Sequence, residues 1–202
     1  MSDKISKNVS YKEATRTSVK LDNTPTRVHL KNMKIIAKEI FEPLRKGLGN
    51  NPIKINSFYR RVPVNKIIGG SSRSQHCKGM AIDMDGIDST NAELFFYILD
   101  KLDFDQLIWE KGDSKQPDWV HVSYRSDNPS KNRKQALVLR DGRYMLYSDT
   151  LCERYKAKAK AKPKAKAESK AVKKPKTVKV KATKSKGDEV TPKRRIGRPK
   201  KK

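Results

Sequence analysis

Cysteines and long apolar runs are scarce in this chain of 202 residues. Its two cysteines, Cys77 and Cys152, provide no disulfide framework and no paired-cysteine metal motif, which favours a reducing compartment. No apolar run approaches the ~20 residues that a transmembrane helix needs. Residues 1–10 are polar and lack the apolar core of a secretory signal peptide. We therefore expect no membrane span and no export by the usual secretory route.

Acidic residues are also few, and their shortage is concentrated at one end of the chain. The net charge is +26, and residues 156–202 hold 21 of the 48 Lys and Arg but only 3 of the 22 Asp and Glu. This segment repeats Lys-Ala and contains prolines but no apolar periodicity, so it cannot bury enough apolar surface to offset its ordering entropy. We predict a globular domain over residues 1–155, with 1–22 as an N-terminal arm, and a disordered basic tail over 156–202.

Two segments carry apolar residues at steps of three and four, which predicts amphipathic helices. The first is expected to begin at Thr24-Pro25, where Thr24 can cap and Pro25 suits the first turn, and to end near Gly47. The second follows Asp88-Ser89-Thr90, a run of capping residues, and extends to about Leu102. Two helices of this kind can cover a sheet.

Short segments with alternating apolar residues predict strands, and Asp141-Gly142 favours a tight hairpin turn between the last two. The predicted helices and strands do not alternate regularly along the chain, which indicates an α+β domain with a mainly antiparallel sheet and flanking helices. The predicted strands are 53–58, 80–85, 106–110, 119–124, 137–140 and 144–147.

The residues with the clearest chemistry are two histidines and an aspartate. His76 precedes Asp83 by seven positions, and it comes from a loop that can fold back toward the strand carrying Asp83. His121 alternates with Val120 and Val122, so it faces away from the side on which these valines pack. Two histidines and one carboxylate leave the fourth position of a tetrahedral zinc site open, which is typical of a catalytic site.

The stretch Ser74-Gln75-His76-Cys77-Lys78-Gly79-Met80-Ala81-Ile82-Asp83 resembles the Ser-x-His-x-x-Gly-x-Ala-x-Asp signature of the zinc D-Ala-D-Ala carboxypeptidase family. Trp119-Val120-His121 completes that signature, and Ser57-Phe58-Tyr59-Arg60 adds to a resemblance that covers roughly residues 9–150 and is greatest to compact phage and bacterial members. The resemblance implies a fold shared with the hedgehog signalling domain. It also implies that His76, Asp83 and His121 bind Zn²⁺.

The same resemblance suggests roles for other residues. Asp118 stands three positions before His121, where the family has its general base, usually Glu, and Glu110 is the other candidate base. Arg60 matches the arginine that holds the substrate carboxylate or polarises the carbonyl, which suits its planar fork. Residues expected to line the substrate pocket are Ser74 and Gln75.

The function implied by the resemblance is zinc-dependent hydrolysis of peptidoglycan stem or cross-link peptides. The enzyme would either remove a terminal D-Ala as a carboxypeptidase or cut between L-Ala and D-Glu as an endopeptidase. The missing export signal fits a phage endolysin in the host cytoplasm or a virion component, acting on the wall after release. We expect a monomer.

The basic tail suggests a second partner. Residues 194–200 resemble an AT-hook with Ile196 in place of the usual Arg before the glycine, and Lys and Arg bind any polyanion by counterion release. DNA is the first choice of ligand, and anionic wall polymers are the rival. The alternative function is therefore a DNA- or polyanion-binding protein built on an inactive peptidase domain. The candidate nucleic-acid-binding residues are Arg194, Arg195, Gly197, Arg198, Pro199 and Lys200.

Overall fold

The computed structural model describes residues 3–152, and the predicted basic tail with its nucleic-acid-binding residues lies outside this range. Within it the chain forms a six-stranded sheet in the order β1-β2-β4-β3-β5-β6. All neighbouring strands are antiparallel except β3 and β5, which are parallel. This confirms the predicted α+β class with a mainly antiparallel sheet. The strands are β1 (Ile53–Ser57), β2 (Ala81–Gly86), β3 (Gln106–Glu110), β4 (Trp119–Ser123), β5 (Gln135–Arg140) and β6 (Arg143–Leu146).

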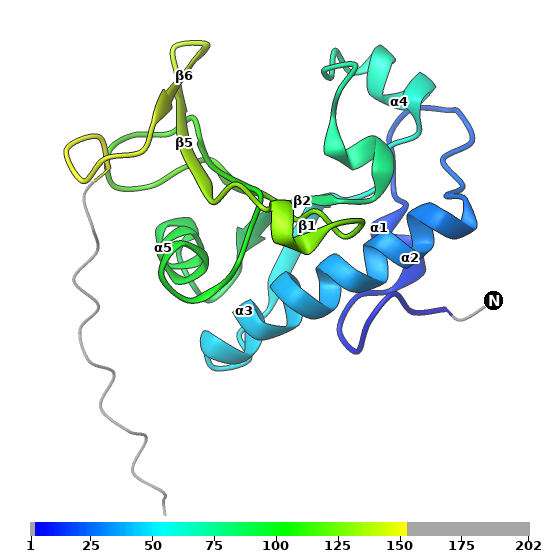
Figure 1. Cartoon of the computed structure of the whole chain (residues 1–202), viewed down its shortest axis with the longest axis horizontal. Coiled ribbons are helices and arrows are strands. Elements are labelled where there is room, and N and C mark those ends of the chain that lie inside the picture. The colour runs from blue at the N-terminus through cyan, green and yellow to red at the C-terminus, as the bar shows by residue number, and fades with distance from the viewer. Residues whose placement is uncertain (1–2, 153–202) are drawn as a thin grey trace, which may run out of the picture. The chain divides into compact units, whose positions relative to one another are not determined.

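The longest helical segment is continuous from α2 through a π-helical turn to α3, because the residues at both junctions keep right-handed helical backbone angles. Figure 1 shows this segment and α5 on one side of the strands and the short α4 on the other. The helices are α1 (Tyr11–Ala14), α2 (Arg27–Ile36), the π-helical η1 (Ala37–Phe41), α3 (Glu42–Gly47), α4 (Val62–Ile67), the 3₁₀ turn η2 (Gln75–Lys78), α5 (Asn91–Lys101) and the 3₁₀ turn η3 (Pro129–Lys131).

The first helix starts later than the sequence predicts. Its N-cap is Thr26, whose hydroxyl accepts a hydrogen bond from the His29 N–H, so the prediction of a cap at Thr24 is wrong. The Thr24 N–H instead donates to the Asp22 carboxylate at 2.9 Å, a local turn that competes with helix formation. The predicted cap of α5 is confirmed at Thr90, which forms a capping box with Glu93.

The two faces of the sheet have different roles. Side chains such as Trp109, Val120 and Val122 are fully buried in the core against the α2–α3 segment and α5. Burying each of them contributes roughly 1.5–3 kcal/mol of folding free energy. Because side chains alternate along a strand, His121 and its cross-strand partner Ile108 point to the opposite face. That face carries the polar site.

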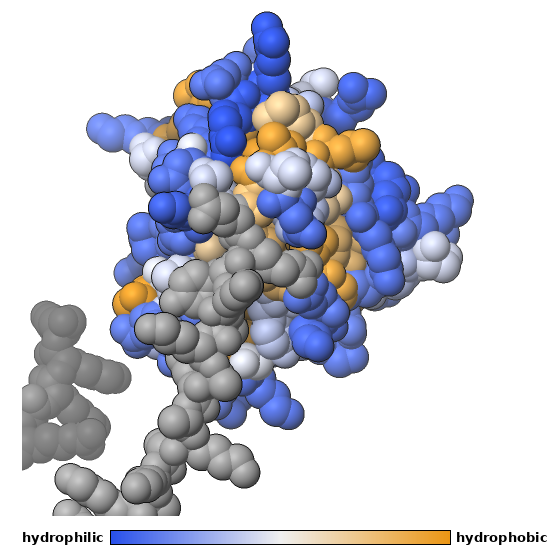
Figure 2. Space-filling view, turned by 90° about the vertical axis from the view of Figure 1, so that its left-hand side faces the viewer, coloured by the Kyte–Doolittle hydropathy of each residue, from blue (hydrophilic) through white to orange (hydrophobic). Residues whose placement is uncertain are grey.

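The hairpin at the end of the described range is built as predicted. Asp141 and Gly142 both have positive φ angles, 52° and 72°, as a two-residue primed turn requires, and Arg140 pairs with Arg143 across it. Strand β6 lies at the edge of the sheet, and its Tyr144 and Leu146 are largely exposed. Figure 2 faces this side of the molecule and shows a limited apolar area among hydrophilic residues.

Helix α4 was not predicted from the sequence, since Val62–Ile67 has only six residues and no room for a helical repeat. It leads into the Gly69–Ser71 loop beside the polar face. No helix in the described part of the chain is long and apolar enough to cross a membrane.

Candidate metal centre and active site

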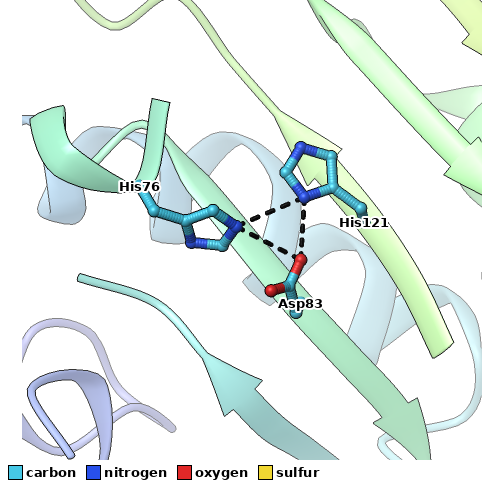
Figure 3. A group of neighbouring side chains, drawn as sticks. All are labelled: His76, Asp83 and His121. Atoms are coloured by element: carbon cyan, nitrogen blue, oxygen red, sulfur yellow. Dashed lines mark hydrogen bonds and ion pairs between the residues drawn. The ribbon is translucent and has the colours of Figure 1, made fainter. Parts of the chain in front are cut away.

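Three side chains from three different elements converge on the polar face of the sheet. His76 lies in η2, Asp83 is in the middle of β2, and His121 is in the middle of β4. Asp83 and His121 are direct partners in the antiparallel β2–β4 ladder, which brings their side chains together on one face. His76 reaches the same point from the turn that precedes β2 (Figure 3). The structure thus brings together the three residues of the predicted ligand set.

The distances between the three ligand atoms suit a metal ion. His76 Nε2 is 3.2 Å from Asp83 Oδ1 and 3.3 Å from His121 Nδ1, and His121 Nδ1 is 2.7 Å from Asp83 Oδ1. Zinc–nitrogen bonds of about 2.0–2.1 Å at tetrahedral angles place neighbouring ligand atoms roughly 3.3 Å apart. Two of the three separations match that value. The group could therefore hold a metal ion with little rearrangement.

A main-chain contact fixes which nitrogen of His76 is available. Its Nδ1–H donates to the Phe58 carbonyl oxygen at 2.7 Å, and a carbonyl can only accept, so Nδ1 carries the proton. Burial lowers the pKa of His76, although the negative charge of Asp83 opposes this effect. A neutral ring with a protonated Nδ1 leaves the Nε2 lone pair free. That is the state in which histidine binds a metal.

Arg60 orients the carboxylate. Its Nη2 donates to Asp83 Oδ2 at 3.2 Å, which leaves Oδ1 directed at the two histidines. Burial tends to raise the pKa of Asp83, but its contacts with His76 and His121 outweigh this effect and hold that pKa well below the ordinary value. Asp83 is thus ionised at neutral pH, as a carboxylate ligand must be.

A cavity of about 410 Å³ opens above these side chains. Its wall includes the loop after α4, the start of η2, the middle of β3 and β4, and the edge strand β6. All the predicted site residues in the described range line it except Asp118. The lining residues predicted from the sequence are Arg60, Ser74, Gln75, His76, Asp83, Glu110 and His121.

The sequence profile of the Peptidase M15 family matches residues 7–123, more than half of the chain. The chain belongs to the Peptidase M15 family. The matched range includes the three converging side chains, Arg60 and Glu110. Membership implies a metallopeptidase, which confirms the coarse prediction of enzyme class. Zinc is the metal on which this family depends, and the group of His76, Asp83 and His121 could hold such an ion. No curated protein matches the chain.

The structure separates the two candidate bases of this Peptidase M15 chain. Glu110 lies on β3 two residues from Ile108, the partner of His121, so it shares the site face and lines the cavity. It is only 7% exposed, and this burial raises its pKa above the ordinary value. Asp118 is exposed and lies outside the cavity lining, one residue before β4. Alternation along β4 places it with Val120, opposite His121.

Several cavity residues were missed by the sequence analysis. Ile108 and Trp119 follow from alternation once the register with His121 and Glu110 is known. Tyr144 reaches the cavity because β5 pairs with β3 and β6 pairs with β5. No local sequence pattern predicts this strand order. Tyr144 and the rest of β6 lie beyond residues 7–123, so they form a wall that the family match does not cover.

A buried carboxylate, Asp105, links the cavity residue Gln75 to Arg133. Only 2% exposed, it accepts hydrogen bonds from Arg133 Nε at 2.9 Å, from Arg133 Nη2 at 2.8 Å and from Gln75 Nε2 at 3.1 Å. Burial tends to raise the pKa of Asp105, but the bonds and charge of Arg133 outweigh it and hold the pKa below the ordinary value. This network ties η2, and with it His76, to the start of β5.

We expect Asp105→Asn to lower the free energy of unfolding by about 1–2 kcal/mol at pH 7, because it removes a charge-assisted pair whose arginine is half exposed. A depressed folded-state pKa contributes stability above the unfolded value of about 3.9 and loses it as the pH falls through the folded value. The deficit measured by urea denaturation should therefore shrink as the pH falls below about 3.9. Asp127→Asn, an exposed control, should change stability by less than about 0.5 kcal/mol. A stability deficit of Asp105→Asn that is equal at pH 7 and well below about pH 3.9 would contradict this account.

Proposed function

We propose that this chain is a zinc-dependent peptidase that hydrolyses peptides of bacterial peptidoglycan. The observation that carries the proposal is the convergence of His76, Asp83 and His121 at the base of a cavity in a Peptidase M15 chain. The cavity holds both a buried acid and a guanidinium, which are the groups that peptide hydrolysis needs beside a metal.

In this proposal His76, Asp83 and His121 hold the zinc ion. The bound ion would supply a Lewis acid that polarises the peptide carbonyl and makes water a better nucleophile at neutral pH. Glu110 accepts the proton of the attacking water and returns it to the leaving amine, a task for which a buried carboxylate with a raised pKa is suited. Arg60 keeps Asp83 oriented and, from the cavity wall, favours negative charge on the substrate.

The biological setting that we propose follows from the sequence. The protein is proposed to be a phage enzyme that is released onto the wall or carried in a virion, and to act as a monomer. Residues 194–200 are proposed to bind DNA or another polyanion by counterion release. The alternative, a DNA-binding protein with an inactive peptidase domain, is less favoured because the three ligand atoms and Glu110 are all in place.

The direct test is to incubate the full-length protein with defined stem peptides and cross-linked dimers, and to identify the products by mass spectrometry. We expect cleavage by the zinc-loaded protein, loss of cleavage after chelation, and recovery when zinc is restored. The product masses distinguish loss of a terminal D-Ala from a cut between L-Ala and D-Glu. A folded, zinc-loaded protein that cleaves none of these peptides would exclude the peptidase proposal and favour the binding-protein alternative.

A further inference from the structure

A second, smaller cavity adjoins the active site. Its volume is about 240 Å³, and it shares Arg73 and Gln75 with the cavity above the metal ligands. It lies where β4 ends and where β3 and β5 begin, and it is lined by side chains from η2 and from the segments next to those strands. The two cavities are therefore neighbours on the surface.

The charges of this second cavity are unbalanced. Its cationic side chains are Arg73, Lys78, Arg125 and Arg133, and its acidic ones are Asp105 and Asp127. Asp105 accepts hydrogen bonds from Arg133 and Gln75. The charges of Asp105 and Arg133 cancel, so this ion pair adds no net charge to the cavity. That leaves three cations facing one acid. None of these three cations has a side-chain hydrogen bond or ion pair to another residue in the described range 3–152, so their donors are available to a ligand.

Hydrogen bonds fix the backbone position of one of these residues, Arg125. The Arg125 N–H donates to Asn132 Oδ1 at 2.9 Å, and the preceding Tyr124 N–H donates to the Met80 carbonyl at 3.0 Å, which continues the β2–β4 pairing past Ser123. Arg125 follows His121 by four residues along this extended chain. At about 3.3 Å per residue the two positions are at most roughly 13 Å apart, the length of about four residues of an extended peptide.

We propose that this cavity binds a carboxylate that the substrate peptide carries away from the cleaved bond. The proposal rests on the proposed peptidase function and adds a substrate class to it, namely acidic peptides. Arginine guanidinium groups form paired hydrogen bonds with carboxylates, and the cavity is large enough for one such group but not for a folded polymer. None of the three candidate metal ligands lines this second cavity, so a carboxylate bound in it is separate from the peptide bond held at the metal.

Two of the cations, Arg125 and Arg133, lie beyond residues 7–123, the range matched by the family profile. The second cavity is therefore a feature of this chain in addition to the metal centre. Because Arg125 is partly buried and has no anionic partner within the described residues, it is the residue on which the test depends.

The experiment uses the zinc-loaded full-length protein and stem peptides in which each carboxylate is replaced by a carboxamide, one at a time, the C-terminal one included. For the wild type, amidation at one position remote from the cleaved bond should lower kcat/KM about tenfold, the loss expected for a charge-assisted hydrogen bond. For Arg125→Gln the same amidation should change kcat/KM less than about twofold, because the partner is already absent. Lys31→Gln on α2, which removes the same charge from a residue that lines neither cavity, should behave as the wild type.

The outcomes separate the two proposals. If the wild type cleaves all the peptides at rates within about twofold of one another, the carboxylate site is disproved while the peptidase stands. The carboxylate site is likewise disproved if Arg125→Gln and Lys31→Gln retain equal discrimination between the acidic and amidated peptides. If the folded, zinc-loaded wild type cleaves no peptide at all, the peptidase proposal itself fails, and the carboxylate site fails with it.

Discussion

Replacing His121 with alanine is expected to lower kcat/KM for stem-peptide cleavage by about 1,000-fold or more and to reduce the bound zinc to well below one ion per chain. His121 is the cross-strand partner of Asp83, and its Nδ1 is 2.7 Å from the Asp83 oxygen, so no other described side chain can take its place from β4. Zinc content by elemental analysis and product formation by mass spectrometry measure the two effects separately.

The matched control is His29→Ala. His29 hydrogen-bonds the Tyr59 hydroxyl at 3.0 Å and does not line the cavity, so its loss should leave kcat/KM within about threefold of the wild type. If the His121 variant kept zinc-dependent cleavage at a comparable rate, the metal centre described above would not be the active site.

Glu110→Gln is expected to lower kcat by about 100- to 10,000-fold, the range attributed to general acid–base catalysis, while the zinc content stays unchanged. The substitution keeps the shape of the buried side chain and removes only its ability to take up a proton. Asp118→Asn should retain kcat within about threefold, because Asp118 is exposed on the opposite side of the strand. The reverse ranking of the two variants would return the general base to Asp118.

The pH profile offers a second readout of the same assignment. A general base must be ionised, so kcat/KM should fall as the pH drops through the pKa of Glu110. Burial raises that pKa, so the acidic limb should lie above the ordinary glutamate value of about 4.3. The residual activity of Glu110→Gln should lack this limb.

The sequence predicted those parts of the site that short patterns in the chain indicate, and it failed where strand pairing decides which side chains meet. His76 and Asp83 are seven residues apart on a turn and the following strand, and His121 alternates with apolar neighbours, so short patterns were enough to bring the three together. The choice between Glu110 and Asp118 needed the register of β3 against β4, because a shift of one residue reverses the face of a side chain.

The fold shows the same division between local and distant relations. The conformation of the Asp141-Gly142 turn is set by these two residues alone, and it was predicted correctly. The parallel pairing of β3 with β5 joins residues nearly thirty positions apart, and nothing in either strand specifies it. The second cavity collects side chains from four separate segments, so charge composition alone could not reveal that Arg73, Lys78 and Arg125 face one space.

The strand order has a consequence for how this enzyme can diversify. The candidate metal ligands lie on β2 and β4, which have neighbours on both sides, and on the turn leading into β2. The side chains that would contact the rest of a substrate come from the sheet edge, from loops, and from residues after 123. Mutations in those outer parts can alter which peptide is accepted while the chemistry stays intact. A lineage of enzymes with the proposed function can therefore change which peptides it accepts through mutations in these outer parts, while the candidate metal centre stays the same.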